Sequence, residues 1–187
     1  MVKNILQKVN NYIQGIYDND EYNWIHNNYV TKYALILGKR LNADLEILEI
    51  SARFHDCNYS RGRDWHAQDS AQVAKEFLLK EGYPQDKTDI VVKIILCHRK
   101  QLLKEMSSPP IEGKILNDAD VMWRLTPSGI ARLIAHRYKK NTSYKFIVDL
   151  ISKDLKKYDK LNFDISKELV KGDYEVCRVF LKKMITE

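Results

Sequence analysis

Residues 44–56 read DLEILEISARFHD, a stretch in which apolar side chains recur every three or four positions before a His-Asp pair. Asp44 is suited to cap a helix, and Leu48, Ala52 and His55 then share one helical face. The stretch therefore predicts a helix whose C-terminal end presents a histidine and an aspartate in front of a polar loop.

The same helical spacing continues on both sides of this stretch, without the alternation of a half-buried strand. Seven glycines and four prolines interrupt the chain, and Gly82 is placed to stop a helix. The expected helices span residues 2–17, 23–41, 45–55, 65–81 with Asp64 as cap, and 85–98, followed by one after Pro110 and one after Thr126-Pro127. The sequence predicts an all-α protein.

Two or three more helices are expected between residues 128 and 187, where the charged run 153–157 is expected to be solvated. A chain of 187 residues has room for one domain with a full hydrophobic core. We expect a single helical bundle with a motif-bearing core at about residues 20–135, and the helices of residues 136–187 packing on that core.

The composition is that of a soluble globular protein, with 44% apolar and 30% charged residues. Its three cysteines lack short paired spacing, and the sequence shows neither a secretory signal nor an apolar stretch of about 20 residues. These features predict a cytoplasmic protein without a membrane partner. The net charge of +6 is compatible with anionic ligands and equally with a role in solubility alone.

Four of the five histidines fall at or near the ends of apolar stripes on four different predicted helices: His26, His55, His66 and His98. A single histidine on an apolar face is usually a core residue satisfied by one hydrogen bond. Several imidazoles and a carboxylate facing one bundle interior would be costly to bury without a cation. Imidazole and carboxylate are ligands that divalent transition metals accept, so the pattern indicates a metal site.

Taken in order, these motifs resemble the HD-domain superfamily of metal-dependent phosphohydrolases, whose pattern is a histidine, a His-Asp pair and a distant aspartate. The resemblance covers roughly residues 20–135. It rests on Trp24-Ile25-His26, Arg53-Phe54-His55-Asp56, His66-Ala67-Gln68-Asp69-Ser70-Ala71, Cys97-His98-Arg99 and Glu112-Gly113-Lys114-Ile115-Leu116-Asn117-Asp118-Ala119-Asp120.

The resemblance implies one or two divalent cations, drawn from Mn, Fe, Co, Ni, Zn and Mg. It assigns His26, His55, Asp56 and Asp120 to a first ion, and it implies His66 and His98 for a second ion bridged by Asp56. Helical periodicity alone does not choose between Asp118 and Asp120, and the family pattern favours Asp120.

A bound cation would lower the pKa of its water and neutralise charge on phosphoryl oxygens, with Asp56 as the catalytic residue that orients the water. Basic residues beside the motifs are candidates to hold a substrate phosphate: Arg61, Arg63, Arg99 and Lys100. We expect a small phosphorylated substrate, with nucleotides as the first class to test.

Two other readings keep parts of this picture. Some members of the superfamily use a di-iron pair on the same six ligands to activate oxygen, and His66 and His98 permit this. A non-catalytic module that binds nucleotide or RNA is the other reading, although it would have no chemical need for the complete ligand set. Binding of nucleic acid is therefore not favoured, and the sequence leaves the oligomeric state open.

Overall fold

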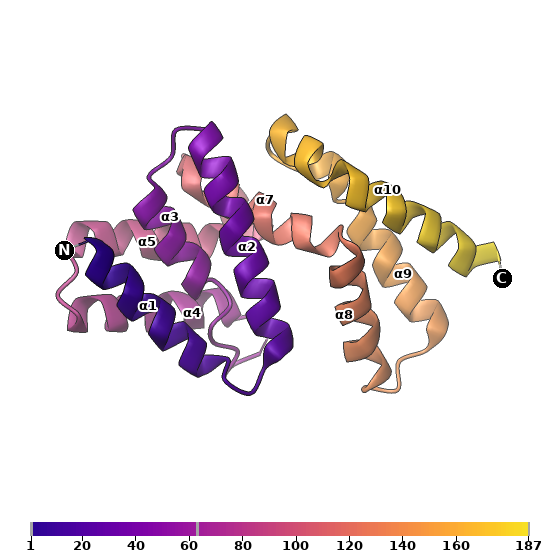
Figure 1. Cartoon of the computed structure of the whole chain (residues 1–187), viewed down its shortest axis with the longest axis horizontal. Coiled ribbons are helices and arrows are strands. Elements are labelled where there is room, and N and C mark those ends of the chain that lie inside the picture. Colours follow the sequence, from indigo (N-terminus) through magenta and orange to yellow (C-terminus); the bar gives the residue numbers. More distant parts are fainter. Residues whose placement is uncertain (1, 63, 187) are drawn as a thin grey trace. The chain divides into compact units, whose positions relative to one another are not determined.

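The computed structural model describes residues 2–62 and 64–186, apart from the side chains of Val2, Lys3 and Lys100. The described residues form helices and no strand, which confirms the all-α prediction (Figure 1). The chain divides into two compact units, residues 1–119 and 120–187, with the boundary inside helix α7 (Ile111–Arg124). The predicted packing of residues 136–187 on the motif-bearing core stays a prediction.

The first unit is built around α3, which contacts α1, α2, α4 and α5. The helices are α1 (Val2–Ile16), α2 (Glu21–Arg40), α3 (Leu45–Phe54), α4 (His66–Lys80), α5 (Gln85–Cys97) and α6 (Lys100–Glu105). Leu48, Ile50 and Phe54 on α3 have no exposed surface. Burying each such side chain contributes about 1.5–3 kcal/mol, so α3 is the anchor of this core.

Most helix ends follow their local signals. The carboxylate of Asp44 accepts hydrogen bonds from the backbone N–H groups of Glu46 and Ile47 at 3.0 and 3.1 Å. Gly82 ends α4 with a φ of +74°, a backbone conformation that favours glycine. Helix α2 begins two residues earlier than expected because Asp20 accepts a hydrogen bond from the backbone N–H of Asn23 at 3.1 Å.

Two expectations about the first unit are corrected. The residue that flanks the start of α4 is Trp65, and its side chain makes no capping hydrogen bond. The prediction that Asp64 caps this helix is therefore wrong. The Asp64 side chain is 90% exposed and lies beside Arg99 instead. The short helix α6 was not predicted from the sequence, because six residues are too few to show a periodic pattern.

The second unit contains α8 (Pro127–Tyr138), α9 (Tyr144–Leu155), a short 3₁₀ turn (Tyr158–Lys160) and α10 (Asp164–Thr186). Helix α10 contacts both α8 and α9. The predicted start of α8 is confirmed, since Thr126 Oγ1 accepts a hydrogen bond from Gly129 N at 3.1 Å and Pro127 follows at the first helical position. These helices form a compact three-helix unit.

The charged run 153–157 is only partly solvated, which corrects the expectation. Leu155 is buried, and Lys157 is half-buried and donates a hydrogen bond to Asp154. Burial lowers the pKa of Lys157, and the nearby charge of Arg124 lowers it further.

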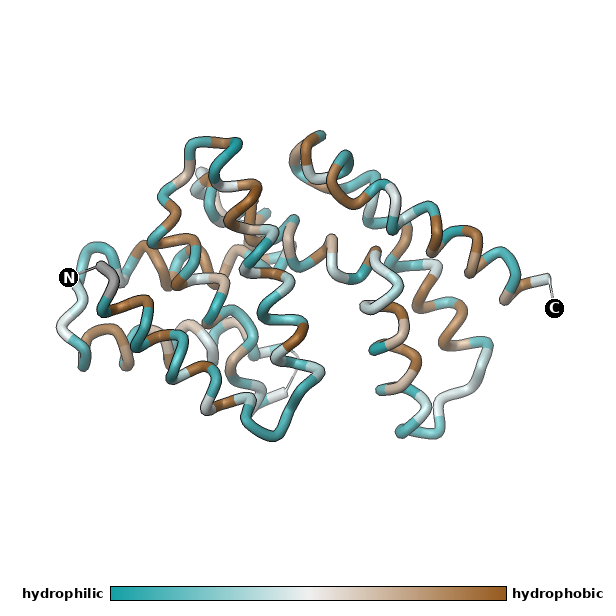
Figure 2. The backbone as a smooth tube through the Cα atoms, in the orientation of Figure 1, coloured by the Kyte–Doolittle hydropathy of each residue, from teal (hydrophilic) through white to brown (hydrophobic). Residues whose placement is uncertain are grey.

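Each helix of both units carries apolar and polar residues interspersed along its length (Figure 2). None of the helices in the described part of the chain combines the length and the hydropathy of a membrane-spanning segment.

Candidate metal centre

The carboxylate of Asp56 lies between two pairs of histidines. Its Oδ2 atom is 3.5 Å from His26 Nε2 and 3.7 Å from His55 Nε2. Its Oδ1 atom is 3.3 Å from Nε2 of both His66 and His98. One carboxylate therefore faces four imidazole nitrogens, two with each oxygen.

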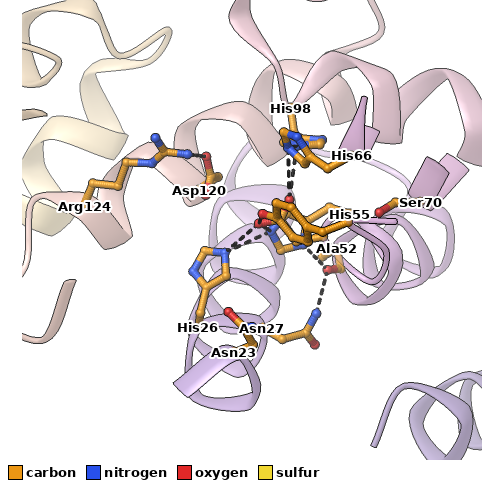
Figure 3. Close-up of polar contacts among 12 residues, drawn as sticks. Asn23, His26, Asn27, Ala52, His55, His66, Ser70, His98, Asp120 and Arg124 are labelled. Carbon is orange, nitrogen blue, oxygen red and sulfur yellow. Dashed lines mark hydrogen bonds and ion pairs between the residues drawn. The ribbon is translucent and has the colours of Figure 1, made fainter. Parts of the chain in front are cut away.

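Each of these histidines comes from a different part of the first unit. His26 lies in the second turn of α2, His55 directly follows α3, His66 begins α4, and His98 directly follows α5. In Figure 3, His66 and His98 lie together on one side of His55, and His26 lies on the other side. All four histidines are buried, so the packing of α2, α3, α4 and α5 fixes their positions.

The backbone sets the protonation of two of these rings. His55 Nδ1 is 2.7 Å from the carbonyl oxygen of Ala52, and His98 Nδ1 is 2.6 Å from that of Ile95. A carbonyl oxygen only accepts, so Nδ1 must carry the proton in both rings. In the neutral rings, Nε2 then presents a lone pair toward the centre of the cluster, as a metal ligand requires.

The separations within the pairs also fit a cation. His26 Nε2 and His55 Nε2 are 3.2 Å apart, and His66 Nε2 and His98 Nε2 are 2.8 Å apart. Two lone pairs at such distances, beside a carboxylate, repel each other unless a proton or a cation lies between them. The donor set of imidazole nitrogen and carboxylate oxygen suits a divalent transition metal in each group.

The electrostatics of Asp56 favour positive charge in this cluster. Burial works to raise the pKa of this carboxyl group, but the charge of a protonated His55 and hydrogen bonds from protonated His26 and His98 outweigh burial when no cation takes their place. Its pKa is held well below the ordinary value. Asp56 is therefore an anion at neutral pH, as a bridging ligand must be.

The ligand atoms form two groups in which every member lies within 4.8 Å of the others. One group contains His26, His55, Asp56 and Asp120, and the other contains Asp56, His66 and His98. Asp120 belongs to α7, the helix whose first nine residues lie in the first unit. Asp118, the alternative on the same helix, is buried and belongs to neither group.

The sequence analysis assigned no role to several residues that hold the centre in place. Asn117 donates a 2.7 Å hydrogen bond to the carbonyl oxygen of His98. Asn27 donates to the carbonyl oxygen of Arg53 at 2.8 Å and accepts from the Arg53 side chain at 3.0 Å. Asn27 follows His26 and Asn117 precedes the aspartates of α7, so proximity to a motif was the only signal.

Two further contacts reach the carboxylates directly. The hydroxyl of Tyr59 donates to Asp56 Oδ2, and Arg124 Nη2 donates to Asp120 Oδ2 at 2.8 Å. The spacing of four residues between Asp120 and Arg124 could have predicted the second contact. Tyr59 lies in a loop, where no periodicity predicts which way a side chain points.

The four basic residues proposed for phosphate binding differ in their surroundings. Arg61 forms an ion pair with Asp69, and its side chain is 57% exposed. Arg99 donates to the backbone carbonyl of Asp64. Arg63 and the side chain of Lys100 lie outside the described residues.

A family comparison covers the region that carries these ligands. The model of the HD domain matches residues 24–124. The uncharacterized protein YpgQ of Bacillus subtilis is 25% identical in an alignment of 189 positions that covers 95% of this chain and 91% of that protein.

Solved structures share the fold over nearly the whole chain. The crystal structure of Bacillus subtilis YpgQ in complex with ADP matches with a TM-score of 0.76 at 24% identity, covering 98% of this chain and 95% of that one. An HD-superfamily hydrolase from Bacillus thuringiensis matches with a TM-score of 0.73 at 20% identity, covering 99% and 97%. These likenesses establish the fold and leave the chemistry to the residues of this chain.

Proposed function

This chain belongs to the HD domain family, and on that premise we propose that it is a metal-dependent phosphohydrolase acting on a nucleotide or a related phosphorylated metabolite. The family and fold support a metal-dependent phosphohydrolase in general. The substrate class and the individual ligands are the proposal.

The observation that carries the proposal is the position of Asp56 between two histidine pairs. The first ion would be held by His26, His55, Asp56 and Asp120, and the second by Asp56, His66 and His98. Carboxylate and imidazole groups of this kind bind divalent metals, and the geometry of both groups is compatible with one ion each. A pair of ions sharing a carboxylate is a common arrangement in phosphate-ester hydrolysis.

When bound, a divalent cation lowers the pKa of its water, supplies a nucleophile near neutral pH and neutralises charge on phosphoryl oxygens. The residues of the chain would then bind and orient the reactants. Asp56, an anion held between the rings, would accept a hydrogen bond from the attacking water and fix its direction. Hydrogen bonds from the Nδ1 atoms of His55 and His98 to backbone carbonyl oxygens keep both rings in the orientation that directs Nε2 inward.

Phosphate binding is proposed for Arg61, Arg63, Arg99 and Lys100. Arg61 is paired with the carboxylate of Asp69, which lies on α4 three residues after His66. Arg99 directly follows His98 and donates to the carbonyl oxygen of Asp64, in the loop before α4. Guanidinium groups bind phosphate oxygens through paired, charge-assisted hydrogen bonds. The solved complex of the relative YpgQ with ADP supports a nucleotide as the ligand class.

The test combines metal analysis with a substrate panel. Purified wild-type protein and the Asp56→Ala variant are analysed for bound metal, and then assayed with nucleotides and sugar phosphates in added manganese, cobalt or nickel. Stoichiometric metal in the wild type, absent from the variant, together with metal-stimulated phosphate release, is the expected result. Absence of metal from both proteins after soaking would refute the metal-dependent mechanism and support a non-catalytic binding module.

Asp120→Asn and Asp118→Asn form a matched pair for the disputed ligand. Both positions are buried on α7, and each substitution preserves volume while removing charge. We expect metal loss in Asp120→Asn and retention in Asp118→Asn. The reverse pattern would assign the ligand to Asp118.

A di-iron oxygenase is the second candidate, favoured by the close His66–His98 pair that shares Asp56 with the other group. Bound iron, a visible absorption band and oxygen consumption would identify it. A colourless protein that hydrolyses phosphate with manganese or cobalt would exclude it.

A further inference from the structure

The positive charge of the chain is not shared between the two units. Residues 1–119 carry 16 basic and 16 acidic side chains, whereas residues 120–187 carry 15 basic and 9 acidic ones. The whole excess of +6 therefore lies in the second unit. An excess spread over the whole chain would suit solubility alone, whereas an excess confined to one unit favours an anionic partner of that unit.

Within the second unit, positive charge is concentrated on α8, the start of α9 and the connection between them. Residues 121–148 contain no acidic residue. Their basic residues are Arg124, Arg132, Arg137, Lys139, Lys140 and Lys145. Burial lowers the pKa of His136, and the charges of Lys140 and Arg137 lower it further. This histidine therefore lies in a strongly positive environment.

Four of these cations are open to a ligand. None of them forms an ion pair with the residues that the structure describes, and they are Arg137, Lys139, Lys140 and Lys145. The three lysines are exposed, and Arg137 is half-buried. Because no carboxylate neutralises them, these side chains keep their full attraction for phosphate groups.

Three aromatic rings with exposed surface lie among the cations. Tyr138 ends α8 and is 79% exposed, Tyr144 begins α9 and is 61% exposed, and Phe146 is 46% exposed. Tyr144 is held in place, because its hydroxyl donates a 2.8 Å hydrogen bond to the carbonyl oxygen of Met184. Large aromatic side chains are usually well buried, so exposed rings between cations indicate a binding surface.

The connection between α8 and α9 brings these groups to one end of the helix pair (Figure 1). The backbone N–H of Thr142 donates to the carbonyl oxygen of Arg137 at 3.3 Å. The Arg137 guanidinium lies 5.9 Å from the centre of the Phe146 ring, which joins the two helices. The cations and rings thus form one surface, the α8–α9 surface, which consists of Arg137, Tyr138, Lys139, Lys140, Tyr144 and Lys145.

We infer that the α8–α9 surface binds single-stranded nucleic acid. Its lysine and arginine side chains contact the phosphates, and unpaired bases stack on Tyr138 and Tyr144. Every base has a face that stacks on an aromatic ring, so the binding has little sequence preference. The complete set of metal ligands speaks against nucleic acid as the ligand of the metal centre, and this surface contains none of those ligands. The inference does not depend on the proposed function.

An anionic membrane is the other partner that such charge would suit. Helices that bind in a membrane interface insert an apolar face rich in Trp, Phe or Leu beside their cations. The two most exposed rings of the α8–α9 surface are tyrosines, and the Phe146 ring has the Arg137 guanidinium beside it. These features favour stacking with bases over insertion into lipid.

The experiment is fluorescence anisotropy of labelled oligo(dT) and oligo(U) strands with chelator-treated full-length protein at several salt concentrations. Chelation prevents the proposed metal centre from cleaving the probe. Each phosphate contact contributes about −0.7 to the slope of log K against log salt, so four cations predict a slope of about −3. A duplex of the same length hides the base faces, and we expect it to bind about tenfold more weakly at physiological salt. No binding of either strand, or a duplex that binds as tightly, would overturn the inference.

Charge variants locate the phosphate contacts. Lys139→Gln/Lys140→Gln should reduce the steepness of the salt dependence by about 1.4 and weaken binding about tenfold. The matched control is Lys153→Gln/Lys156→Gln, which removes two exposed charges at the opposite end of α9 and should leave the affinity nearly unchanged. Equal losses in the two double variants would assign the binding to net charge and overturn the inference.

Aromatic variants test the stacking. Tyr138→Ala should weaken binding of both strands about tenfold, and Tyr138→Phe should keep the wild-type affinity. Circular dichroism of each variant checks that the fold is preserved. Unchanged affinity in Tyr138→Ala would refute stacking and leave a surface that attracts any polyanion. Binding to phosphatidylserine vesicles without binding to either strand would identify a membrane as the partner and overturn the inference.

Discussion

The hydroxyl of Tyr59 donates a 2.8 Å hydrogen bond to Oδ2 of Asp56. The ring of the same tyrosine stacks on His66, with centroids 4.9 Å apart and planes 3° apart. One side chain from the loop after α3 thus contacts the central carboxylate and one histidine of the second group.

Replacing Tyr59 by phenylalanine keeps the stacked ring and removes only the hydrogen bond. Residues that orient metal ligands typically change metal affinity about 10–100-fold when replaced, and we expect a loss of about tenfold for Tyr59→Phe. A competitive metal titration measures it, with the exposed Tyr22→Phe as control. Unchanged metal affinity in Tyr59→Phe would mean that the hydroxyl has no part in holding Asp56.

Metal removal should destabilise the wild-type protein. A ligand that binds only the folded state adds about 2.7 kcal/mol to the free energy of unfolding at 100 times its Kd. We expect a chelator to lower the Tm of the wild type and to leave that of Asp56→Ala unchanged, in differential scanning calorimetry. An equal shift in both proteins would show that the stabilising ion binds elsewhere.

Asp69 should contribute to stability above its titration range. Hydrogen bonds from the Arg61 side chain, followed by its backbone N–H and charge, lower the pKa of Asp69. A carboxyl group with a lower pKa in the folded state stabilises the protein above its unfolded pKa, and this contribution fades as the pH falls through the folded pKa. The difference in unfolding free energy between wild type and Asp69→Asn should therefore shrink from pH 6 toward pH 3.

Asp69→Asn also tests the loop that carries Tyr59. Asp69 accepts hydrogen bonds from Ser60 Oγ and from Arg61 N, both at 3.2 Å, and these bonds tie the loop to α4. Denaturant unfolding across the pH range measures the effect. If the difference in unfolding free energy between wild type and Asp69→Asn stays constant with pH, the charge of Asp69 is excluded as its source.

Gly113 should not accept a larger side chain. A Cβ atom at this position would lie 2.6 Å from Cys97 Sγ and 2.7 Å from Cys97 Cβ, closer than such atoms pack. Overpacking of this kind costs about 1–3 kcal/mol, and we expect Gly113→Ala to lower the unfolding free energy by that amount. Gly15→Ala is the matched control, because nothing lies within 4 Å of its Cβ and alanine favours the helix. Equal stability of the two variants would contradict the predicted clash.

The sequence was sufficient for the parts of the fold that depend on local chemistry. Asp44, Gly82 and Thr126-Pro127 act within a few residues, through a cap, a left-handed φ and a fixed proline, so the helix ends they predict are confirmed. His55 and His98 end apolar stripes, and the structure likewise has them directly after α3 and α5. Stripe positions fix which side of a helix faces the core.

Features that depend on packing between elements could not be predicted in this way. Asp64 has the right residue type for a cap, yet its carboxylate lies beside Arg99, 35 residues along the chain. Lys157 belongs to a charged run, and its partial burial arises from the packing of the second unit. The contact of Tyr59 with Asp56 depends on a loop conformation that hydrogen bonds to Asp69 maintain.

The placement of Asp56 has a consequence for how the two proposed ions would bind. Because each oxygen of one carboxylate faces a different histidine pair, an ion in one group would alter both the charge and the orientation that the other group offers. The two occupancies would then be thermodynamically linked, and whatever factor the first ion applied to the affinity of the second, the second would apply to the first. The centre would respond to metal concentration as one cooperative or anticooperative unit, with a midpoint and steepness that belong to the pair.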